Sequence, residues 1–410
     1  MDTDRGLKMK TKLKKIWNTP ITGAQLYLLA FAIYFIPAFL IDSLYTNYIS
    51  WSKLRLLTYL AIPILIFKIY VMDRWRWPTK LFITGLILFS VIAWRASRYP
   101  ELMVTMVFVL AASGIDFKQV ARWYLYLSVT FLVIIAVTSL VHIVPNLVYT
   151  SALRPNRYGL GMAYTTYVAS HALFSALAYC YVRFGKLGWL DYLGIAIVAF
   201  VTMKYTNTRL DFYAMLLMIP VMWITQRAAN GKRYAQIISS FWWIATPVLA
   251  VITLTGSYFF DDHNQIYRKF NELLSGRLGL SKKAFSMYDP NIFGRYIQEK
   301  AFGGAKGQAF ANQNQFGLSA DYFYIDSSFV RMLLLWGIVI FLLFIVAMTF
   351  IALVNTIQRK YILSAIVMLV AINSMVEPHS LQLIYNVFIL ALIPQIEWVK
   401  HKLSGDNYVK

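Results

Sequence analysis

The sequence predicts an all-α polytopic membrane protein with about 12 transmembrane helices and one long folded extracytoplasmic loop. Hydrophobic residues make up 59% of the 410-residue chain and charged residues only 14%, whereas a soluble domain has about 45–50% and about 25%. The apolar residues gather in runs of about 20, the length that crosses a bilayer. A chain in lipid must satisfy its backbone hydrogen bonds within each segment, so these runs should be helices.

The apolar runs divide the chain into a first set of nine predicted helices in residues 21–260 and a second set of three in residues 328–399. The expected spans lie near residues 21–40, 54–72, 81–94, 102–112, 123–144, 163–182, 189–205, 210–226, 237–260, 328–353, 361–375 and 381–399. The fourth and the eleventh runs are short for a bilayer.

The two ends of the chain are expected on the cytoplasmic side. Residues 1–20 form a basic stretch, and the run that follows is too long, and too poor in small residues, to be a removable signal peptide. Residues 400–410 form the expected cytoplasmic tail. Lys and Arg concentrate in the loops that share this side, as the positive-inside rule requires. Topology therefore explains much of the formal charge of +21, and nucleic acid is not an expected partner.

Residues 261–327 are the one long polar insertion, and loops of this length are usually functional or disordered. A folded cap that rests on the bilayer is expected, because one helical face there is apolar and Ser275-Gly276 would then stop the helix. The residues of this face are Ile266, Tyr267, Phe270, Leu273 and Leu274.

Arginines in short outer loops need an explanation other than topology. The stretch Arg154-Pro155-Asn156-Arg157-Tyr158-Gly159-Leu160-Gly161 is predicted to be a loop whose Pro and Gly residues bring backbone N–H groups and two guanidinium groups together. Such an arrangement suits phosphate. Alternatively, the two arginines are solvated or paired with lipid headgroups.

A second arginine is expected at the membrane edge. Thr206-Asn207-Thr208-Arg209 lies between two spans that are joined by almost no loop. A charge in that position is a functional candidate by default. The alternative is that Arg209 only extends to the surface.

The long loop is itself basic. Eight basic residues against three acidic ones in residues 268–306 would steer an anion toward this surface, unless they form an ordinary solvated face. Arg277 is distinctive because it directly follows the predicted helix stop, so its side chain can project from a turn toward the membrane surface.

Two acidic segments complete the candidates. Asp326-Ser327-Ser328 precedes the tenth predicted span and also has the pattern of an N-terminal helix cap. Glu377-Pro378-His379 occupies the last short outer turn, where an acid beside an imidazole can handle protons. A turn held by Pro378 is the structural alternative.

The sequence offers no motif for soluble catalysis and no expected cofactor. A phosphate-binding loop, a zinc-spaced histidine pair and a nucleophile elbow are absent from the sequence. Cys180 is the only cysteine, which excludes an internal disulfide. No acidic metal-binding pair accompanies the outer arginines, so arginine rather than a metal ion is expected to neutralise a phosphate leaving group.

In their order, these motifs resemble the Wzy family of bacterial polysaccharide polymerases, relatives of the O-antigen ligases among the GT-C-like membrane glycosyltransferases. The resemblance spans most of the chain and lies in Arg157–Gly161, Thr206–Arg209, Ser275–Arg277, Asp326–Ser328 with Trp336-Gly337, and Glu377. Each motif is short, so their order and common outer placement carry the specificity.

The resemblance implies a GT-C-like fold in the bacterial plasma membrane. A growing glycan would be transferred from undecaprenyl diphosphate to a lipid-linked repeat unit at the outer face. The implied partners are undecaprenyl-diphosphate-linked oligosaccharides, membrane lipids, a chain-length regulator and a flippase. The implied catalytic residues are Arg157, Arg209 and Arg277, which would hold diphosphate, and Asp326 or Glu377 as proton acceptor. The implied substrate-binding residues are Arg154, Asn156, Tyr158, Asn207 and His379.

The sequence also departs from the family pattern. Tyr164-Thr165-Thr166 stands where many relatives have His-Pro-Asn, and His263 lies at the start of the long loop rather than beyond Arg277. The second departure favours a polymerase over the alternative of an O-antigen ligase-type glycosyltransferase. A flippase or exporter of lipid-linked glycan is a further alternative, disfavoured because few charges lie inside the spans and no repeated half is evident.

Overall fold

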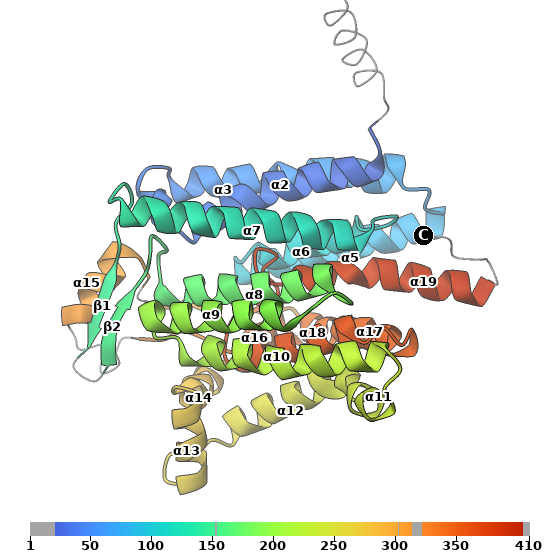
Figure 1. Cartoon of the computed structure of the whole chain (residues 1–410). Helices are drawn as coiled ribbons and strands as arrows, with labels where there is room; N and C mark the ends of the chain where they lie inside the picture. The colour runs from blue at the N-terminus through green and yellow to red at the C-terminus, as the bar shows by residue number, and fades with distance from the viewer. Residues whose placement is uncertain (1–20, 152–153, 302, 314–321, 405–410) are drawn as a thin grey trace, which may run out of the picture.

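The computed structural model describes residues 21–151, 154–301, 303–313 and 322–404, and these are mostly helical. The predicted basic N-terminus lies outside the described residues, as does most of the predicted tail. The long helices run side by side along one direction (Figure 1). The long helices and the short helical turns between them are α2 (Gly23–Ile41), α3 (Trp51–Tyr59), α4 (Ala61–Phe67), η2 (Lys68–Met72), α5 (Trp77–Ser97), α6 (Glu101–Leu110), α7 (Phe117–Leu140), α8 (Thr165–Arg183), α9 (Trp189–Thr206), α10 (Arg209–Ala229), α11 (Arg233–Ser239), η3 (Trp242–Ile244), α12 (Ala245–Tyr258), α16 (Ser328–Arg331), η4 (Met332–Trp336), α17 (Ile338–Ile357), α18 (Ile362–Ser374), η5 (Val387–Ala391) and α19 (Leu392–Ser404).

Seven helical segments of the described chain are long and apolar enough to cross a membrane. They are Gly23–Ile41, Trp51–Met72, Trp77–Ser97, Phe117–Leu140, Arg209–Ala229, Arg233–Tyr258 and Ile338–Ile357. The fourth and eleventh predicted spans, which are short in sequence, are also short apolar helices, α6 and α18. The prediction of a helical, multi-spanning membrane protein is confirmed at this level.

The helix limits follow local chemistry. The Thr22 hydroxyl accepts the Gln25 N–H while the Gln25 side chain accepts the Thr22 N–H, a reciprocal cap that begins α2. The Asp116 carboxylate caps α7 in the same position. The tenth predicted span is broken after η4, because Gly337 has a φ of 92° that ends one helix and begins α17.

A β-hairpin is the main departure from an all-α fold. The strands β1 (Val148–Ser151) and β2 (Arg154–Tyr158) pair antiparallel, with Tyr149 opposite Arg157. The predicted loop at Arg154–Gly161 is therefore wrong over its first five residues. β1 is rich in β-branched and aromatic residues, which fit a pleated strand, and a nearby partner satisfies their backbone groups.

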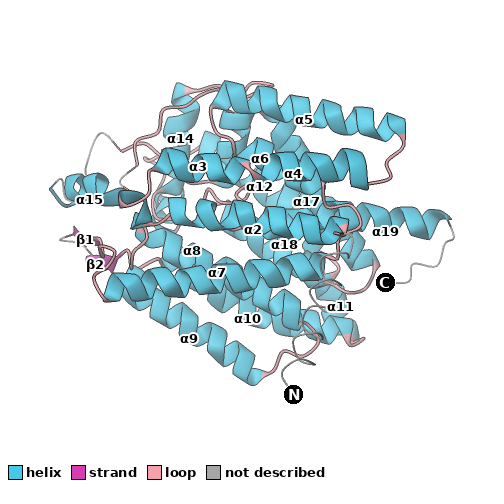
Figure 2. Cartoon of the chain, turned by 90° about the horizontal axis from the view of Figure 1, so that it is seen from above, coloured by secondary structure: helices cyan, strands magenta, loops and turns pink. Residues whose placement is uncertain are grey.

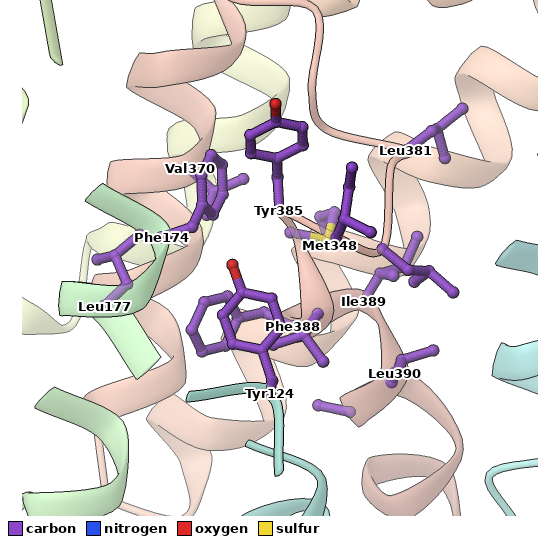
Figure 3. Close-up of a cluster of buried hydrophobic side chains, with 14 of the residues drawn as sticks. Tyr124, Phe174, Leu177, Met348, Val370, Leu381, Tyr385, Phe388, Ile389 and Leu390 are labelled. Carbon is purple, nitrogen blue, oxygen red and sulfur yellow. The ribbon is translucent and has the colours of Figure 1, made fainter. Parts of the chain in front are cut away.

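The core lies between the helices and is strongly aromatic. α8 packs against α7, α9 and α10. Figure 3 shows Tyr124 of α7, Phe174 and Leu177 of α8, and Tyr385 and Phe388 from the C-terminal segment around one interior space. The outward faces of α5 and α9 instead expose large apolar side chains, including Phe82, Leu88 and Phe200. An apolar exterior of this kind suits lipid as solvent.

The described part of the polar insertion is folded, as expected, and lies at one end of the bundle. It contains α13 (Gln265–Leu273), α14 (Arg277–Met287) and α15 (Gly304–Gln313). Figures 1 and 2 show α15 and the hairpin at one end of the bundle, and the C-terminus of α19 at the other end. We call the former the hairpin end.

Candidate functional site

Arg277 is the centre of the candidate site. It begins α14 directly after Ser275 and Gly276, whose positive φ values of 54° and 87° turn the chain. The guanidinium donates from Nε to the Val376 carbonyl at 3.2 Å and from Nη2 to Glu377 Oε1 at 3.2 Å. Its Nε also lies 3.8 Å from Asp326 Oδ2. The loop arginine, the acid before α16 and the acid after α18 are thus one cluster.

The two acids differ in how firmly they are held. The Glu377 side chain is 4% exposed, and its backbone carbonyl accepts from the N–H and the hydroxyl of Ser328. The Asp326 side chain is 14% exposed and meets Arg277 only at the longer distance. Burial raises the pKa of Asp326, and Arg277 opposes that shift. Burial, with the nearby Asp211, raises the pKa of Glu377 well above its ordinary value, again against Arg277.

Asp326 does not cap the following helix. The N-cap residue is Ser327, and its hydroxyl donates to the Ser374 carbonyl at 3.3 Å rather than capping the α16 amides. The capping alternative for Asp326 is therefore wrong, and the carboxylate is left for Arg277. The acids in turn hold the proton on Arg277, since they raise the pKa of its guanidinium despite burial.

Arg157 joins this cluster from the hairpin. Its side chain is buried, donates from Nε to the Thr206 carbonyl at 2.9 Å, and lies 5.6 Å from the Tyr164 ring. Burial raises the pKa of the Tyr164 hydroxyl, while Arg157 and Arg277 lower it and Asp326 raises it. The charges of Arg157, Arg277 and Asp326 therefore all act on the Tyr164 hydroxyl.

The remaining hairpin candidates point elsewhere. Successive strand residues face opposite sides, so the burial of Arg157 turns Asn156 and Tyr158 away from it. Asn156 is exposed, and Tyr158 lies against the ring of Tyr205 at 6.3 Å. The prediction that they line the site is not supported. The side chain of Arg154 is outside the described residues.

Arg209 is also outside the cluster, in contrast to the expectation from its position. Its side chain is exposed at the start of α10, whereas Asp211 is 1% exposed. Two helical positions are about 200° apart, so only one of the pair can face the bundle. Asp211 faces it, and accepts from Ser170 at 3.4 Å and Asn373 at 3.3 Å. Asn207 lies in the turn before α10 with a φ of 49°.

Asp211 is a residue that sequence reasoning missed. The available signal was an acid inside an apolar run, which is a functional candidate by default.

His379 stands beside the cluster in a column of stacked rings. Its Nε2 lies 3.8 Å from Glu377 Oε2, and its Nδ1 lies 3.0 Å from Gln382 Oε1. The ring stacks on Tyr385 at 3.9 Å, and Tyr385 stacks on His171 at 4.1 Å. Burial lowers the pKa of His379 to about 4, so the imidazole is neutral at physiological pH.

His171, inside α8, also packs within this column. It stacks on Phe39 at 4.1 Å. Its Nε2 lies 3.5 Å from Asp42 Oδ2, and Tyr385 donates to the same carboxylate at 2.5 Å. The partly buried Asp42 and the buried Tyr385 are therefore polar partners that the sequence did not single out.

A second buried ion pair, Arg331 with Glu299, stabilises the backbone next to Asp326. Arg331 Nη1 and Glu299 Oε1 lie 2.5 Å apart, and each side chain is 5% exposed. Glu299 also accepts from the Ile325 N–H at 3.0 Å and from the Tyr99 hydroxyl at 3.0 Å. Because Ile325 precedes Asp326, this pair fixes the backbone that presents the Asp326 carboxylate. This pair could not be predicted from the sequence, because its two members lie in different elements.

The site brings arginine and carboxylate side chains together. Within the described ranges, no group of three or more His, Cys, Asp or Glu side chains is arranged to hold a metal ion. Two guanidinium groups and two carboxylates instead share a buried place at the hairpin end. A guanidinium in such surroundings binds phosphate oxygens strongly, and a carboxylate with a raised pKa can take up a proton.

Comparison of the chain with protein-family models, curated proteins and solved structures finds no match.

Proposed function

We propose that this protein is a membrane glycosyltransferase, a polysaccharide polymerase of the bacterial plasma membrane. It would transfer a growing glycan from undecaprenyl diphosphate to a lipid-linked repeat unit at the outer face. The observation that carries the proposal is the meeting of Arg277 with Asp326 and Glu377, beside Arg157. Four of the short motifs on which the family resemblance rests supply these residues, although they are far apart in the sequence.

The proposed topology has twelve crossings in a GT-C-like arrangement, with both termini in the cytoplasm. Support comes from the seven long apolar helices and the two short ones. Further support comes from Figure 1, in which the hairpin and the folded insertion lie at the end opposite to the far end of α19. In this orientation the hairpin end faces outward, where lipid-linked glycans are exposed.

In the proposed reaction, the diphosphate of the donor binds at Arg277 and Arg157. Phosphate oxygens replace a carboxylate as the partner of Arg277. The acceptor hydroxyl oxygen attacks the anomeric carbon, the bond from that carbon to the diphosphate oxygen breaks, and undecaprenyl diphosphate leaves. Guanidinium groups stabilise the charge that develops on the leaving oxygen, a contribution of about 3–4 kcal/mol per well-placed donor in other enzymes.

Asp326 is the proposed acceptor of the hydroxyl proton. It is the more exposed of the two acids and the less tightly paired with Arg277. Glu377 has its backbone fixed by Ser328 and its carboxylate hydrogen-bonded to Arg277, so it is the proposed positioning partner. Asp211 lies next to this acid and contributes to the field of the site.

Purified protein in lipid vesicles, supplied with a lipid-linked repeat unit, tests the proposal. A ladder of products that differ by one repeat is expected, with release of undecaprenyl diphosphate. A single capped acceptor would instead identify a ligase. Movement of the labelled lipid-linked glycan across the vesicle without lengthening would identify an exporter, and either result overturns the polymerase assignment.

A further inference from the structure

We propose that α13 is an interfacial helix that binds the anionic lipid surface of the bilayer at the hairpin end of the bundle. This inference goes beyond the proposed reaction and does not depend on it. Its basis is the combination of an unpartnered apolar helix face, a crosswise orientation, continuity with the lipid-facing surface of α12, and basic side chains around it.

Among the residues that the structure describes, none covers the apolar face of α13. None of its nine residues is buried, and Ile266, Phe270 and Leu273 are 68%, 55% and 71% exposed. These three positions fall within one narrow sector of the helix. Arg268 and Glu272 occupy the opposite side and are also exposed. A short helix with this division belongs at a boundary between an apolar and a polar phase.

The placement of α13 fits a membrane surface. In Figure 1 the helix runs across the direction of the bundle helices, below α14 and beyond the end of α12. The exposed apolar side chains of α12, among them Val251 and Ile252, continue through Tyr258 and Phe259 to the segment before α13. The ring of Phe260 then contacts Tyr267 of α13 at 6.1 Å. The exposed polar residues 261–264 lie between this lipid-facing surface and α13, and the contact of Phe260 with Tyr267 joins the two.

The charge of this region selects an anionic lipid surface. Residues 261–287 contain five basic residues and three acids, Asp261, Asp262 and Glu272. Arg277 belongs to the buried cluster, and Lys282 donates to the Tyr258 carbonyl at 2.6 Å. Arg268, Lys269 and Lys283 are exposed and available to phosphate groups. Each basic residue near an anionic membrane surface contributes about 1 kcal/mol of attraction.

A tight turn connects α13 to Arg277, so the position of α13 at the membrane surface also affects the position of this arginine. The Gly276 N–H donates to the Asn271 carbonyl at 2.7 Å, and the Asn271 side chain accepts from the Gly279 N–H at 3.1 Å. One residue of α13 therefore holds both sides of the turn that precedes Arg277. The depth of α13 in the headgroup layer sets the height of this arginine relative to the bilayer.

Site-specific fluorescence in lipid nanodiscs tests the proposal. The one native cysteine, Cys180, is fully buried, so Leu273→Cys can carry an environment-sensitive label, with Glu272→Cys as the matched control on the polar side. Native protein taken through the same labelling reaction corrects for any reaction at Cys180. Quenchers on lipids near the headgroups should act on position 273, and aqueous iodide should act on position 272.

Three results would overturn the proposal. The first is equal access of iodide to both positions, and the second is lipid quenching of both positions alike. The third is shielding of position 273 from both quenchers, which would indicate that a protein surface covers it. A second comparison uses nanodiscs of phosphatidylcholine with or without phosphatidylglycerol. Lipid quenching at position 273 should be greater with the anionic lipid, and Arg268→Gln with Lys269→Gln should remove the difference. Equal quenching in the two membranes would overturn the electrostatic part of the proposal.

Discussion

Arg277 and Glu377 are one hundred positions apart in the chain, yet the guanidinium Nη2 donates to the carboxylate Oε1 at 3.2 Å in a buried setting. The pair joins the folded insertion to the turn after α18. Removal of one member of such a pair leaves the other as an uncompensated buried charge. Under the proposed function, Arg277 is the cation that binds the incoming diphosphate, which must replace one of these carboxylates.

Arg277→Lys is expected to lower polymerisation by about 100- to 1,000-fold, because lysine keeps the charge but loses the planar two-donor geometry. Arg209→Ala is the control, since Arg209 is exposed at the start of α10. It should retain most of the activity. Both are measured as polymer ladders at equal membrane protein in a strain without the native copy. A ladder lost with Arg209→Ala but kept with Arg277→Lys would contradict the site.

Asp326→Asn should abolish polymer without reducing inserted protein, because the amide cannot accept the hydroxyl proton. In the native protein, burial raises the pKa of Asp326. A base acts only when deprotonated, so the rate should fall on acidification, with a midpoint above the ordinary aspartate pKa of about 3.9. The pH dependence of initial rates in vesicles measures this. A rate that stays constant on acidification to that value would remove Asp326 as the base.

His379→Gln should leave the rate per folded molecule nearly unchanged. The pKa of His379 is lowered to about 4 by burial, so the neutral imidazole adds no charge to the site at physiological pH. Stability should fall by about 0.5–1.5 kcal/mol, because stacking on Tyr385 is lost. Rate and thermal unfolding are measured on the same preparation. A large drop in rate with unchanged stability would assign His379 a chemical role.

Arg331→Ala should destabilise the protein by about 3–5 kcal/mol, because it leaves Glu299 buried and unpaired. The comparison is Arg183→Ala, which removes a partner of Asp191 from a half-exposed pair and should cost about 0–1 kcal/mol. Unfolding by denaturant in detergent gives both values. Similar losses for the two variants would show that burial does not strengthen the inner pair.

Gly337→Ala should destabilise the protein by about 1–3 kcal/mol, the cost of a side chain at a φ of 92° and a ψ of 171°, a region that essentially only glycine adopts. A Cβ at Gly337 would also lie 2.3 Å from the Ile292 carbonyl oxygen, in the loop strand that packs along this helix break. Gly85→Ala in α5 is the matched control, with open space around its Cβ. Thermal unfolding distinguishes them. An unchanged midpoint for Gly337→Ala would mean that the loop moves aside freely.

The sequence predicted the elements whose information is local. Apolar runs located the helices, and Ser275-Gly276 marked the turn that ends the α13 segment. The hairpin was missed because four β-prone residues next to an arginine-rich segment carry no helical or alternating signal. Arg209 was preferred to Asp211 because sequence proximity to the membrane edge does not reveal which face of α10 turns inward. Partners such as Arg331 and Glu299 require the tertiary arrangement.

The separation of Arg277 from Glu377 also governs the biogenesis of the site. A ribosome adds about 5–20 residues per second, so the arginine emerges about 5–20 s before its acidic partner is made. During that interval the insertion is without the turn that completes it. Any chain that stops short of residue 377 lacks the acidic partner of Arg277, so incomplete translation products should be inactive under the proposed function.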